Sequence, residues 1–369
     1  MADAAEQQRE QLNTGTKEVA ESHRFDEARL EAWMQAHVEG FEGPLEVRQF
    51  KGGQSNPTYQ LVTPNKKYVM RRKPPGKLLP SAHAVDREYK VISALYPTGF
   101  PVARSYGLCT DDEVIGTMFY VMDMVEGRIL WDQQLPQYTP EERRPIYMAK
   151  LKTLADLHNT DHEAIGLGDY GKPGNYMGRQ VDRWTKQYRA SETVKLEEME
   201  RLIEWLPRTV PPQERTSIVH GDYRLDNMVL HPTEPRVIAV LDWELSTLGE
   251  PLADFTYLLM NWVNGTIANI EDLEAHGVPS IDEYVAEYCR LTGRDSLPDL
   301  NWYFAYNIFR LAGIIQGIVG RVRDGTANSP QAAAMAERVP LLAKAGWSFA
   351  QKADRKSTRL NSSHVLISY

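Results

Sequence analysis

Three polar residues in the second half of the chain have the types and the spacing that phosphoryl transfer requires. They are Asp222, Asn227 and Asp242, and they lie in the segments 218–230 and 237–244. Moving the terminal phosphoryl group of a nucleotide needs a carboxylate that accepts the proton of the attacking hydroxyl, and oxygen ligands that hold Mg²⁺ against the phosphates. Asp222 suits the first task. Asn227 and Asp242 suit the second, because Mg²⁺ takes few protein oxygens and keeps several waters.

The sequence around these residues predicts a β-hairpin. Residues 228–230 and 237–241 are short apolar runs, and the His-Pro-Thr-Glu-Pro segment between them is typical of a turn. A hairpin of this kind brings Asn227 and Asp242 to the same open end. His220 precedes Asp222 by two residues, and we expect it to support the loop as a packed imidazole, not to carry protons.

The motifs His220-Gly-Asp222 with Asn227 five residues later, Leu241-Asp242-Trp243-Glu244 and Gly249-Glu-Pro-Leu-Ala-Asp254 resemble those of the aminoglycoside phosphotransferase and choline kinase-like superfamily. The resemblance implies an α+β, protein-kinase-like fold of two lobes, with a small β-rich N-lobe, a larger mainly helical C-lobe and ATP in the cleft between them. By that likeness Asp222 is the catalytic base, Asn227 and Asp242 bind magnesium, and Asp254 anchors the catalytic loop.

The N-terminal half contains a candidate phosphate-binding loop between two apolar stretches of segment 50–62. Its glycines leave room for backbone donors to approach an anion. A loop that merely closes a hairpin is the alternative, and the position ahead of a basic strand favours the phosphate role. The predicted nucleotide-binding residues of this loop are Gly52, Gly53, Gln54, Ser55 and Asn56.

A strand that ends in a basic cluster follows at 67–75. The resemblance places Arg71 where a protein-kinase strand carries its phosphate-binding lysine, and arginine suits the task through bidentate contact. Whether Arg71, Arg72 or Lys73 makes the contact stays open. Residues 87–95 predict an amphipathic helix, and the resemblance pairs its Glu88 with Arg71. An exposed helix carboxylate is the alternative role for Glu88.

Residues 119–127 predict an apolar strand that breaks at Glu-Gly. The resemblance makes this segment the hinge between the lobes, where backbone groups of about Met122 to Met124 meet the adenine edge. Core packing of the two methionines is compatible with that role, because flexible thioethers fill irregular gaps.

The Gly-rich stretch 166–184 carries the cations Arg179 and Arg183 on the expected acceptor side. With Ser55-Asn56 and residues 71–75, it is similar to the kinase domain fused to certain acyl-CoA dehydrogenases, a likeness that covers most of 25–350. The likeness implies an acidic hydroxyl acceptor, a hydroxyacyl-CoA or hydroxy acid, which Arg179 and Arg183 would bind. Structural ion pairs are the alternative role for both arginines.

Other functions stay open at this point. An aminoglycoside or choline-type kinase is compatible with the acidic residues near the motifs, and a nucleotide-binding pseudokinase is disfavoured by the complete polar set. A protein kinase is disfavoured because the Asp242 motif lacks Asp-Phe-Gly and no Ala-Pro-Glu follows.

Composition agrees with a cytoplasmic enzyme. The chain has 369 residues, 42% hydrophobic, and a formal net charge of −8, which disfavours nucleic acid and anionic membranes as partners. Cys109 and Cys289 have no metal-type spacing and are expected as free thiols. No signal peptide or membrane-spanning segment is expected. The oligomeric state, and the preference for ATP over GTP, cannot be read from the sequence.

The expected organisation has four parts. Residues 1–24 form a flexible or helical leader, 25–124 the nucleotide-binding N-lobe and 125–355 the catalytic and acceptor-binding C-lobe. Residues 356–369 change abruptly to a Ser-rich composition, which indicates a non-native tail.

Overall fold

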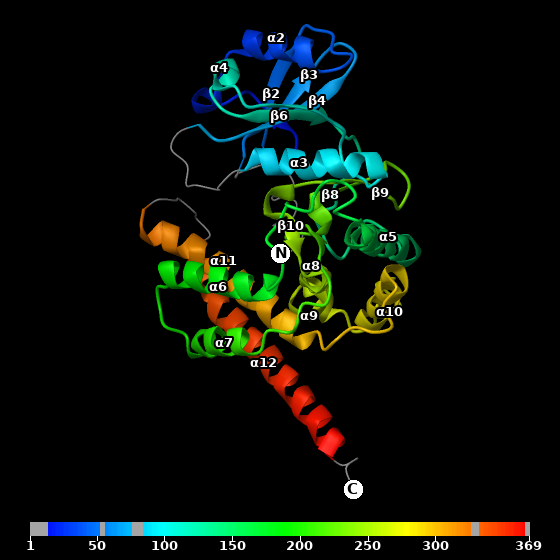
Figure 1. Ribbon diagram of the computed structural model, residues 1–369, viewed down its shortest axis with the longest axis vertical. Coiled ribbons are helices and arrows are strands. Elements are labelled where there is room, and N and C mark those ends of the chain that lie inside the picture. Colours follow the sequence, from blue (N-terminus) through cyan, green and yellow to red (C-terminus); the bar gives the residue numbers. More distant parts are fainter. Residues whose placement is uncertain (1–13, 52–55, 76–83, 326–331, 366–369) are drawn as a thin grey trace.

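The computed structural model of the chain describes residues 14–51, 56–75, 84–325 and 332–365. An N-terminal lobe built on a six-stranded sheet lies above a larger, mainly helical C-terminal lobe (Figure 1). The expected α+β, two-lobed architecture is confirmed.

The N-lobe sheet is antiparallel throughout, in the order β1-β2-β3-β4-β6-β5. Its strands are β1 (Thr16–Lys17), β2 (Glu46–Phe50), β3 (Thr58–Val62), β4 (Lys67–Arg72), β5 (Ser105–Cys109) and β6 (Phe119–Asp123). Strand β1 lies within the expected leader. Because Thr16 pairs with Phe50, residues 16–17 belong to the sheet, and the N-lobe begins earlier than residue 25.

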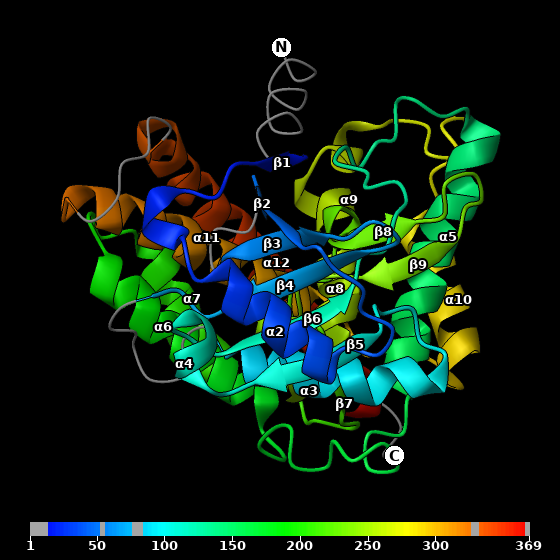
Figure 2. The same cartoon turned by 90° about the horizontal axis from the view of Figure 1, so that it is seen from above.

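Two helices cover opposite faces of this sheet. Helix α2 (Glu27–His37) crosses one face (Figure 2), and α3 (Val85–Leu95) lies under the other (Figure 1). Successive side chains of a strand point to opposite faces. In β4, Tyr68 and Met70 therefore pack in the core beneath α2, whereas Val69 packs against the core on the α3 side. By the same alternation Arg71 faces α3.

The C-lobe combines two small antiparallel ribbons with helices. The ribbons are β8 (Met228–Leu230) with β9 (Val237–Val240), and β7 (Ser217–Val219) with β10 (Thr247–Gly249). The expected hairpin is therefore confirmed. The helices are α5 (Pro140–Asn159), α6 (Tyr176–Ser191), α7 (Glu197–Arg208), α8 (Pro251–Leu258), α9 (Met260–Asn264), α10 (Ile281–Thr292), α11 (Asn301–Arg323) and α12 (Ala332–Val365); the short α4 (Asp112–Ile115) belongs to the N-lobe.

The sequence of residues 254–263 predicts a single helix, but the structure has two: α8 starts at Pro251, and α9 follows after Leu259. The early start has a local cause, because Pro251 occupies the first turn and the Glu250 side chain accepts a hydrogen bond from Leu252 N. Helix α12 continues past residue 356, where the non-native tail was expected to begin.

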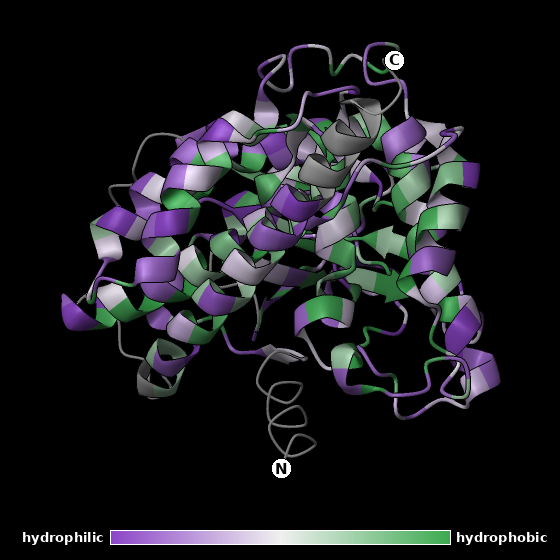
Figure 3. Cartoon of the chain, turned by 90° about the horizontal axis from the view of Figure 1, so that it is seen from below, coloured by the Kyte–Doolittle hydropathy of each residue, from purple (hydrophilic) through white to green (hydrophobic). Residues whose placement is uncertain are grey.

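The helices of the C-lobe bury one continuous apolar core. Seen from below, they alternate hydrophobic and hydrophilic residues around their surfaces (Figure 3), as amphipathic helices around a core do. That core contains Leu151 and Leu154 of α5 and Phe309 of α11, and it extends to α3 of the N-lobe. In the described ranges, none of the helices has the length and hydropathy that a membrane crossing needs.

The segment that joins the lobes pairs directly with the hairpin. Arg128 N donates to Leu230 O at 2.8 Å, and Leu230 N donates to Arg128 O at the same distance. Gly127 makes this approach possible, because a Cβ there would overlap the Leu230 carbonyl and lie 2.7 Å from Val229 Cγ1. The hairpin is thereby held beneath the N-lobe.

We therefore predict that Gly127→Ala destabilises the protein by about 1–3 kcal/mol, as overpacking of a filled site does. Gly168→Ala is the matched control, since a Cβ there meets only Glu163 Cγ, at 3.9 Å. Urea denaturation of both variants checks the prediction. Equal midpoints for the two variants would mean that the linker does not need a glycine at 127.

Candidate active site

The loop that follows β7 is held from behind by one buried carboxylate. Asp254 Oδ2 accepts a hydrogen bond from His220 N at 2.5 Å, and Asp254 Oδ1 accepts one from Gly221 N at 2.9 Å. Burial alone acts to raise the pKa of Asp254, but these donors and the facing His158 hold it below its ordinary value. Asp254 lies on α8, so the helix fixes the start of the loop.

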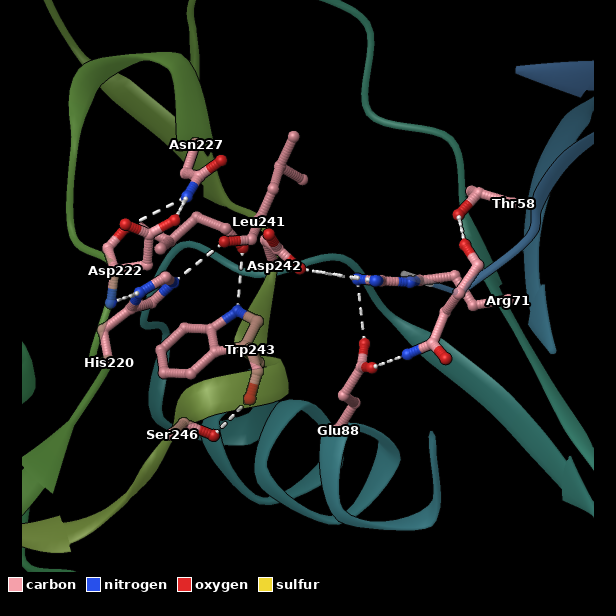
Figure 4. Close-up of polar contacts among 12 residues, drawn as sticks. Thr58, Arg71, Glu88, His220, Asp222, Asn227, Leu241, Asp242, Trp243 and Ser246 are labelled. Atoms are coloured by element: carbon pink, nitrogen blue, oxygen red, sulfur yellow. Dashed lines mark hydrogen bonds and ion pairs between the residues drawn. The ribbon is translucent and has the colours of Figure 1, made fainter. Parts of the chain in front are cut away.

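The buried His220 side chain also holds this loop in place. Its Nδ1 accepts a hydrogen bond from Asp222 N at 3.2 Å, so its Nε2 is the protonated nitrogen and donates to Leu241 O at 2.8 Å. The imidazole thereby connects the loop to the end of β9 (Figure 4). Both nitrogens are engaged with backbone groups, which agrees with a supporting role.

Asp222 is surrounded by groups that favour its ionised form. Its Oδ1 accepts a hydrogen bond from Tyr257 Oη at 2.7 Å, and its Oδ2 lies 3.3 Å from Arg224 Nε. Burial acts to raise the pKa of Asp222, yet the Arg224 charge and the Tyr257 hydroxyl outweigh it and hold the pKa below its ordinary value. The side chain keeps 20% of its surface exposed. A carboxylate of this kind can accept a proton.

Asn227 and Asp242 meet at the open end of the hairpin, where Leu241 N donates to Asn227 O at 2.8 Å. Asn227 Nδ2 donates to the backbone O of Asp222 at 2.9 Å and to its Oδ2 at 3.1 Å, which orients the amide oxygen away from Asp222 (Figure 4). Asp242 has a left-handed backbone with φ of 64°, a conformation that is uncommon outside glycine and clusters at functional sites.

An ion-paired arginine of the N-lobe reaches the same place. Arg71 Nη1 lies 2.9 Å from Glu88 Oε2, and Arg71 Nη2 lies 3.3 Å from Asp242 Oδ1 (Figure 4). Glu88 is buried and also accepts hydrogen bonds from Asn56 Nδ2 at 2.8 Å and Tyr120 Oη at 3.1 Å. Asp242 therefore lies between the catalytic loop and the Arg71–Glu88 pair.

The choice among the three basic residues is a matter of strand geometry. Arg71 points toward Glu88 and Asp242. Arg72 points to the opposite face, where its guanidinium lies 5.3 Å from the Phe25 ring, and Lys73 Nζ lies 3.9 Å from Asp86. Of the three, Arg71 is the residue that contacts Asp242.

The structure describes only some of the other residues that were predicted to bind the nucleotide. Gly52, Gly53, Gln54 and Ser55 lie outside the described residues. In the expected hinge, Met122 is paired within the sheet, Asp123 N donates to Arg104 O at 2.8 Å, and Met124 N donates to Lys67 O at 3.3 Å. The N–H groups of Asp123 and Met124 are therefore already used within the N-lobe.

Arg179 and Arg183 lie on α6, outside the polar network that joins Asp222, Asn227 and Asp242. Arg179 donates to carbonyls of its own preceding loop, those of Lys172 at 2.7 Å and of Gly174. Arg183 is exposed and lies 5.7 Å from the Trp184 ring. No hydrogen bond or ion pair among the described residues joins either arginine to Asp222, Asn227 or Asp242. Arg179 therefore holds its own loop. A structural role was the alternative that the sequence left open for this arginine.

Three residues that sequence reasoning missed lie around Asp222. Arg224 belongs to the motif itself, and its spacing could have indicated it. Tyr257 lies one helical turn after Asp254, and Arg310 is a single cation within the apolar run of α11. Arg310 Nη2 donates to Gly221 O at 2.5 Å, and its guanidinium lies 5.0 Å from the Tyr257 ring. Only the packing of α8 and α11 against the loop shows that Tyr257 and Arg310 lie there.

The residues present suit a hard cation better than a transition metal. Within the described ranges, no group of three or more His, Cys, Asp or Glu side chains gathers in a way that could hold a metal. One amide oxygen and one carboxylate at the hairpin end are the donor set that Mg²⁺ accepts when phosphate oxygens and water complete its shell.

Comparison with known proteins agrees with this geometry. Residues 46–295 match the APH model, described as a phosphotransferase enzyme family. Human acyl-CoA dehydrogenase family member 11 is 42% identical over 92% of this chain, but the chain spans only 45% of that relative's length.

Solved structures extend the comparison. A crystal structure from Ralstonia eutropha, provisionally described as an aminoglycoside phosphotransferase, is 53% identical over 89% of this chain and 99% of its own, with a TM-score of 0.82. Choline kinase from Cryptosporidium parvum shares the fold at 11% identity, with a TM-score of 0.57 over 92% of this chain and 98% of its own. The chain therefore belongs to the APH phosphotransferase enzyme family.

Proposed function

We propose that the protein transfers the γ-phosphoryl group of ATP, with Mg²⁺, to a hydroxyl group of a small molecule. The observation that carries the proposal is the meeting of Asp222, Asn227 and Asp242 at the end of one hairpin, with the Arg71–Glu88 pair of the other lobe reaching Asp242. These parts match the base, metal ligands and phosphate-binding cation of phosphoryl transfer.

Each part of the transfer has a residue to perform it. The acceptor oxygen forms a bond to the γ-phosphorus while its proton passes to Asp222. The bond between that phosphorus and the bridging oxygen breaks, and its electron pair stays on ADP. Asn227 and Asp242 would hold Mg²⁺, which supplies charge neutralisation on the phosphates when bound.

The N-lobe supplies the nucleotide contacts in this proposal. Arg71 contacts the phosphates and is oriented by the buried Glu88. The adenine edge meets backbone groups just after Met124, because the N–H groups of Asp123 and Met124 are already used in the sheet.

We propose a hydroxyacyl-CoA or another hydroxy acid as the acceptor. Two cations lie beside the base, since Arg224 is 3.3 Å from Asp222 and Arg310 donates to the adjacent Gly221 carbonyl. Positive charge there favours an anionic acceptor and opposes a polycation. The likeness to an acyl-CoA dehydrogenase family member supports the same class of acceptor. The description of the Ralstonia relative makes an aminoglycoside the second candidate, with a choline-type amino alcohol as a further member of that class.

Asp222→Asn should lower turnover by ~10²–10⁴-fold, the usual contribution of a general base, while folding and Mg·ATP binding persist. The measurement is Mg·ATP-dependent transfer to a panel of hydroxyacyl-CoAs, hydroxy acids, aminoglycosides and choline. Asp182→Asn, on the exposed face of α6, is the control. Near-normal turnover in Asp222→Asn would remove Asp222 as the base. Mg·ATP binding without transfer to any acceptor would instead indicate a nucleotide-binding pseudokinase.

Asp242→Ala should weaken binding of Mg·ATP far more than binding of metal-free ATP, because it removes a metal ligand and leaves the nucleotide contacts. Isothermal titration with and without Mg²⁺ separates the two. Asp169→Ala serves as control, since that carboxylate is 79% exposed. A variant that binds Mg·ATP as tightly as the wild type would contradict the metal role.

Arg71 and Arg72 form a matched pair of neighbouring arginines on opposite faces of β4. Arg71→Lys should raise the KM for Mg·ATP by about tenfold or more, since a bidentate charged contact is lost. Arg72→Lys should leave that KM within about threefold, whatever its effect on stability. Steady-state kinetics together with thermal melts checks both, and equal KM values for the two variants would refute the assignment.

A further inference from the structure

Tyr257 is a partly buried residue of α8 whose hydroxyl the proposed transfer step does not use. Its Oη donates a hydrogen bond to Asp222 Oδ1 at 2.7 Å. Burial and the facing Asp222 carboxylate raise the pKa of the Tyr257 hydroxyl, so the hydroxyl keeps its proton and is the donor of the pair. A hydrogen bond to an ionised acceptor is stronger than one between neutral groups. The Tyr257 hydroxyl can therefore hold one oxygen of the carboxylate in place.

The other carboxylate oxygen of Asp222 is held from the hairpin. Asn227, just before β8, donates from its Nδ2 to Asp222 Oδ2 at 3.1 Å and to the Asp222 backbone O at 2.9 Å (Figure 4). Arg224 Nε lies 3.3 Å from the same Oδ2, but without hydrogen-bond geometry. Rotation about the Cβ–Cγ bond of Asp222 would move both oxygens away from their donors. The hydrogen bonds from Tyr257 and Asn227 together therefore fix the plane of the carboxylate.

The Tyr257 ring is itself held by a buried arginine of α11. The guanidinium of Arg310 lies 5.0 Å from the centre of the Tyr257 ring and 5.4 Å from that of the Trp184 ring on α6. Both distances are within the range of cation–π attraction. Arg310 Nη2 also donates to the carbonyl of Gly221, at 2.5 Å. Helix α11 therefore contacts both the backbone next to Asp222 and the ring that carries the donor to its carboxylate.

Packing alone does not account for the Tyr257 hydroxyl. The contact with Arg310 needs only an aromatic ring, which phenylalanine also provides. Tyrosine adds one polar group, and that group donates to the residue proposed as the base. Tyr284 of α10 offers a contrast, because its hydroxyl donates to a backbone carbonyl of α5, that of Tyr147, at 2.9 Å. Removing each hydroxyl in turn separates a contact with the proposed base from a contact between two helices.

We propose that Tyr257 is a positioning residue for phosphoryl transfer, whose hydroxyl works with the Asn227 amide to hold the Asp222 carboxylate in the orientation that receives the proton of the acceptor. Arg310 keeps the Tyr257 ring in place for this task. Tyr257 acts through Asp222 and does not itself take up the proton. The orientation of the carboxylate stands on the hydrogen bonds, and its effect on catalysis rests on the function proposed above.

The orientation is tested first, without any substrate. Tyr257→Phe removes the hydroxyl and keeps the ring, and Tyr284→Phe is the matched control, since Tyr284 is fully buried and its hydroxyl is also a hydrogen-bond donor. The readout is the pair of side-chain amide resonances of Asn227 in protein labelled at asparagine, assigned by their loss in Asn227→Asp. We expect Tyr257→Phe to shift or broaden this pair, because the carboxylate that accepts from Asn227 is no longer fixed. Tyr284→Phe should leave it unchanged.

The effect on transfer is tested by a double-mutant cycle. Tyr257→Phe should lower kcat by roughly 10–100-fold, the cost of a small misplacement of a reacting group. The KM for Mg·ATP should stay within about threefold, because the nucleotide contacts remain. In an Asp222→Asn background the same change should have little further effect on the residual turnover, since Tyr257 acts through Asp222. Equal losses of kcat in both backgrounds would overturn the proposal.

The outcomes separate this proposal from the proposed function. Asn227 resonances that are unchanged in Tyr257→Phe refute the positioning role, whatever the activity of that variant. A wild-type protein that transfers no phosphoryl group refutes the proposed function, while the resonances still decide whether Tyr257 orients the carboxylate. If Tyr257→Phe does not fold, Tyr257→Met replaces it and must displace the same resonances.

Discussion

The ion pair between Arg71 and Glu88, which also reaches Asp242, is the interaction on which the site depends most. It joins three elements that are distant in sequence, because Arg71 is on β4, Glu88 on α3 and Asp242 at the end of the hairpin. Glu88 is almost fully buried and takes two further donors, from Asn56 and Tyr120. Removing one partner of such a buried pair leaves an uncompensated charge, which is strongly unfavourable. The pair therefore fixes the N-lobe sheet, α3 and the hairpin end relative to one another.

The C-lobe complements this pair by holding the catalytic loop from behind. Asp254 accepts two successive backbone N–H groups, and His220 connects the loop to Leu241. Arg310 reaches the carbonyl of Gly221 from α11, and Lys150 contacts the loop from α5. The loop is thus supported by α5, α8 and α11 together. A carboxylate placed by rigid elements is already oriented before any substrate binds, which is what a base in the proposed transfer needs.

Local features of the fold were predictable from sequence. The hairpin around 231–235 and the strands at 67–72 and 119–123 follow from short-range apolar patterns and turn residues. The sequence was less informative where packing decides. The start of α8 depends on a cap at Glu250, and the pairing of β1 with β2 joins Thr16 to Phe50 and Lys17 to Gln49, which are far apart in the sequence. Arg179 and Arg183 were chosen from their charge and from a family resemblance, and only the structure shows that Arg179 donates to carbonyls of its own loop.

By itself, the sequence determined which residues are candidates for the proposed transfer, because Asp222, Asn227 and Asp242 lie within one short motif and one hairpin whose turn sets their spacing. Tertiary structure decided which way side chains point and which residues far apart in the sequence contact one another. The pleat of β4 in the assembled sheet turns Arg71 toward Glu88 and Arg72 away from it. Tyr257, Arg310 and Lys150 converge on the catalytic loop only through helix packing, and no local pattern records which face of a helix meets which loop.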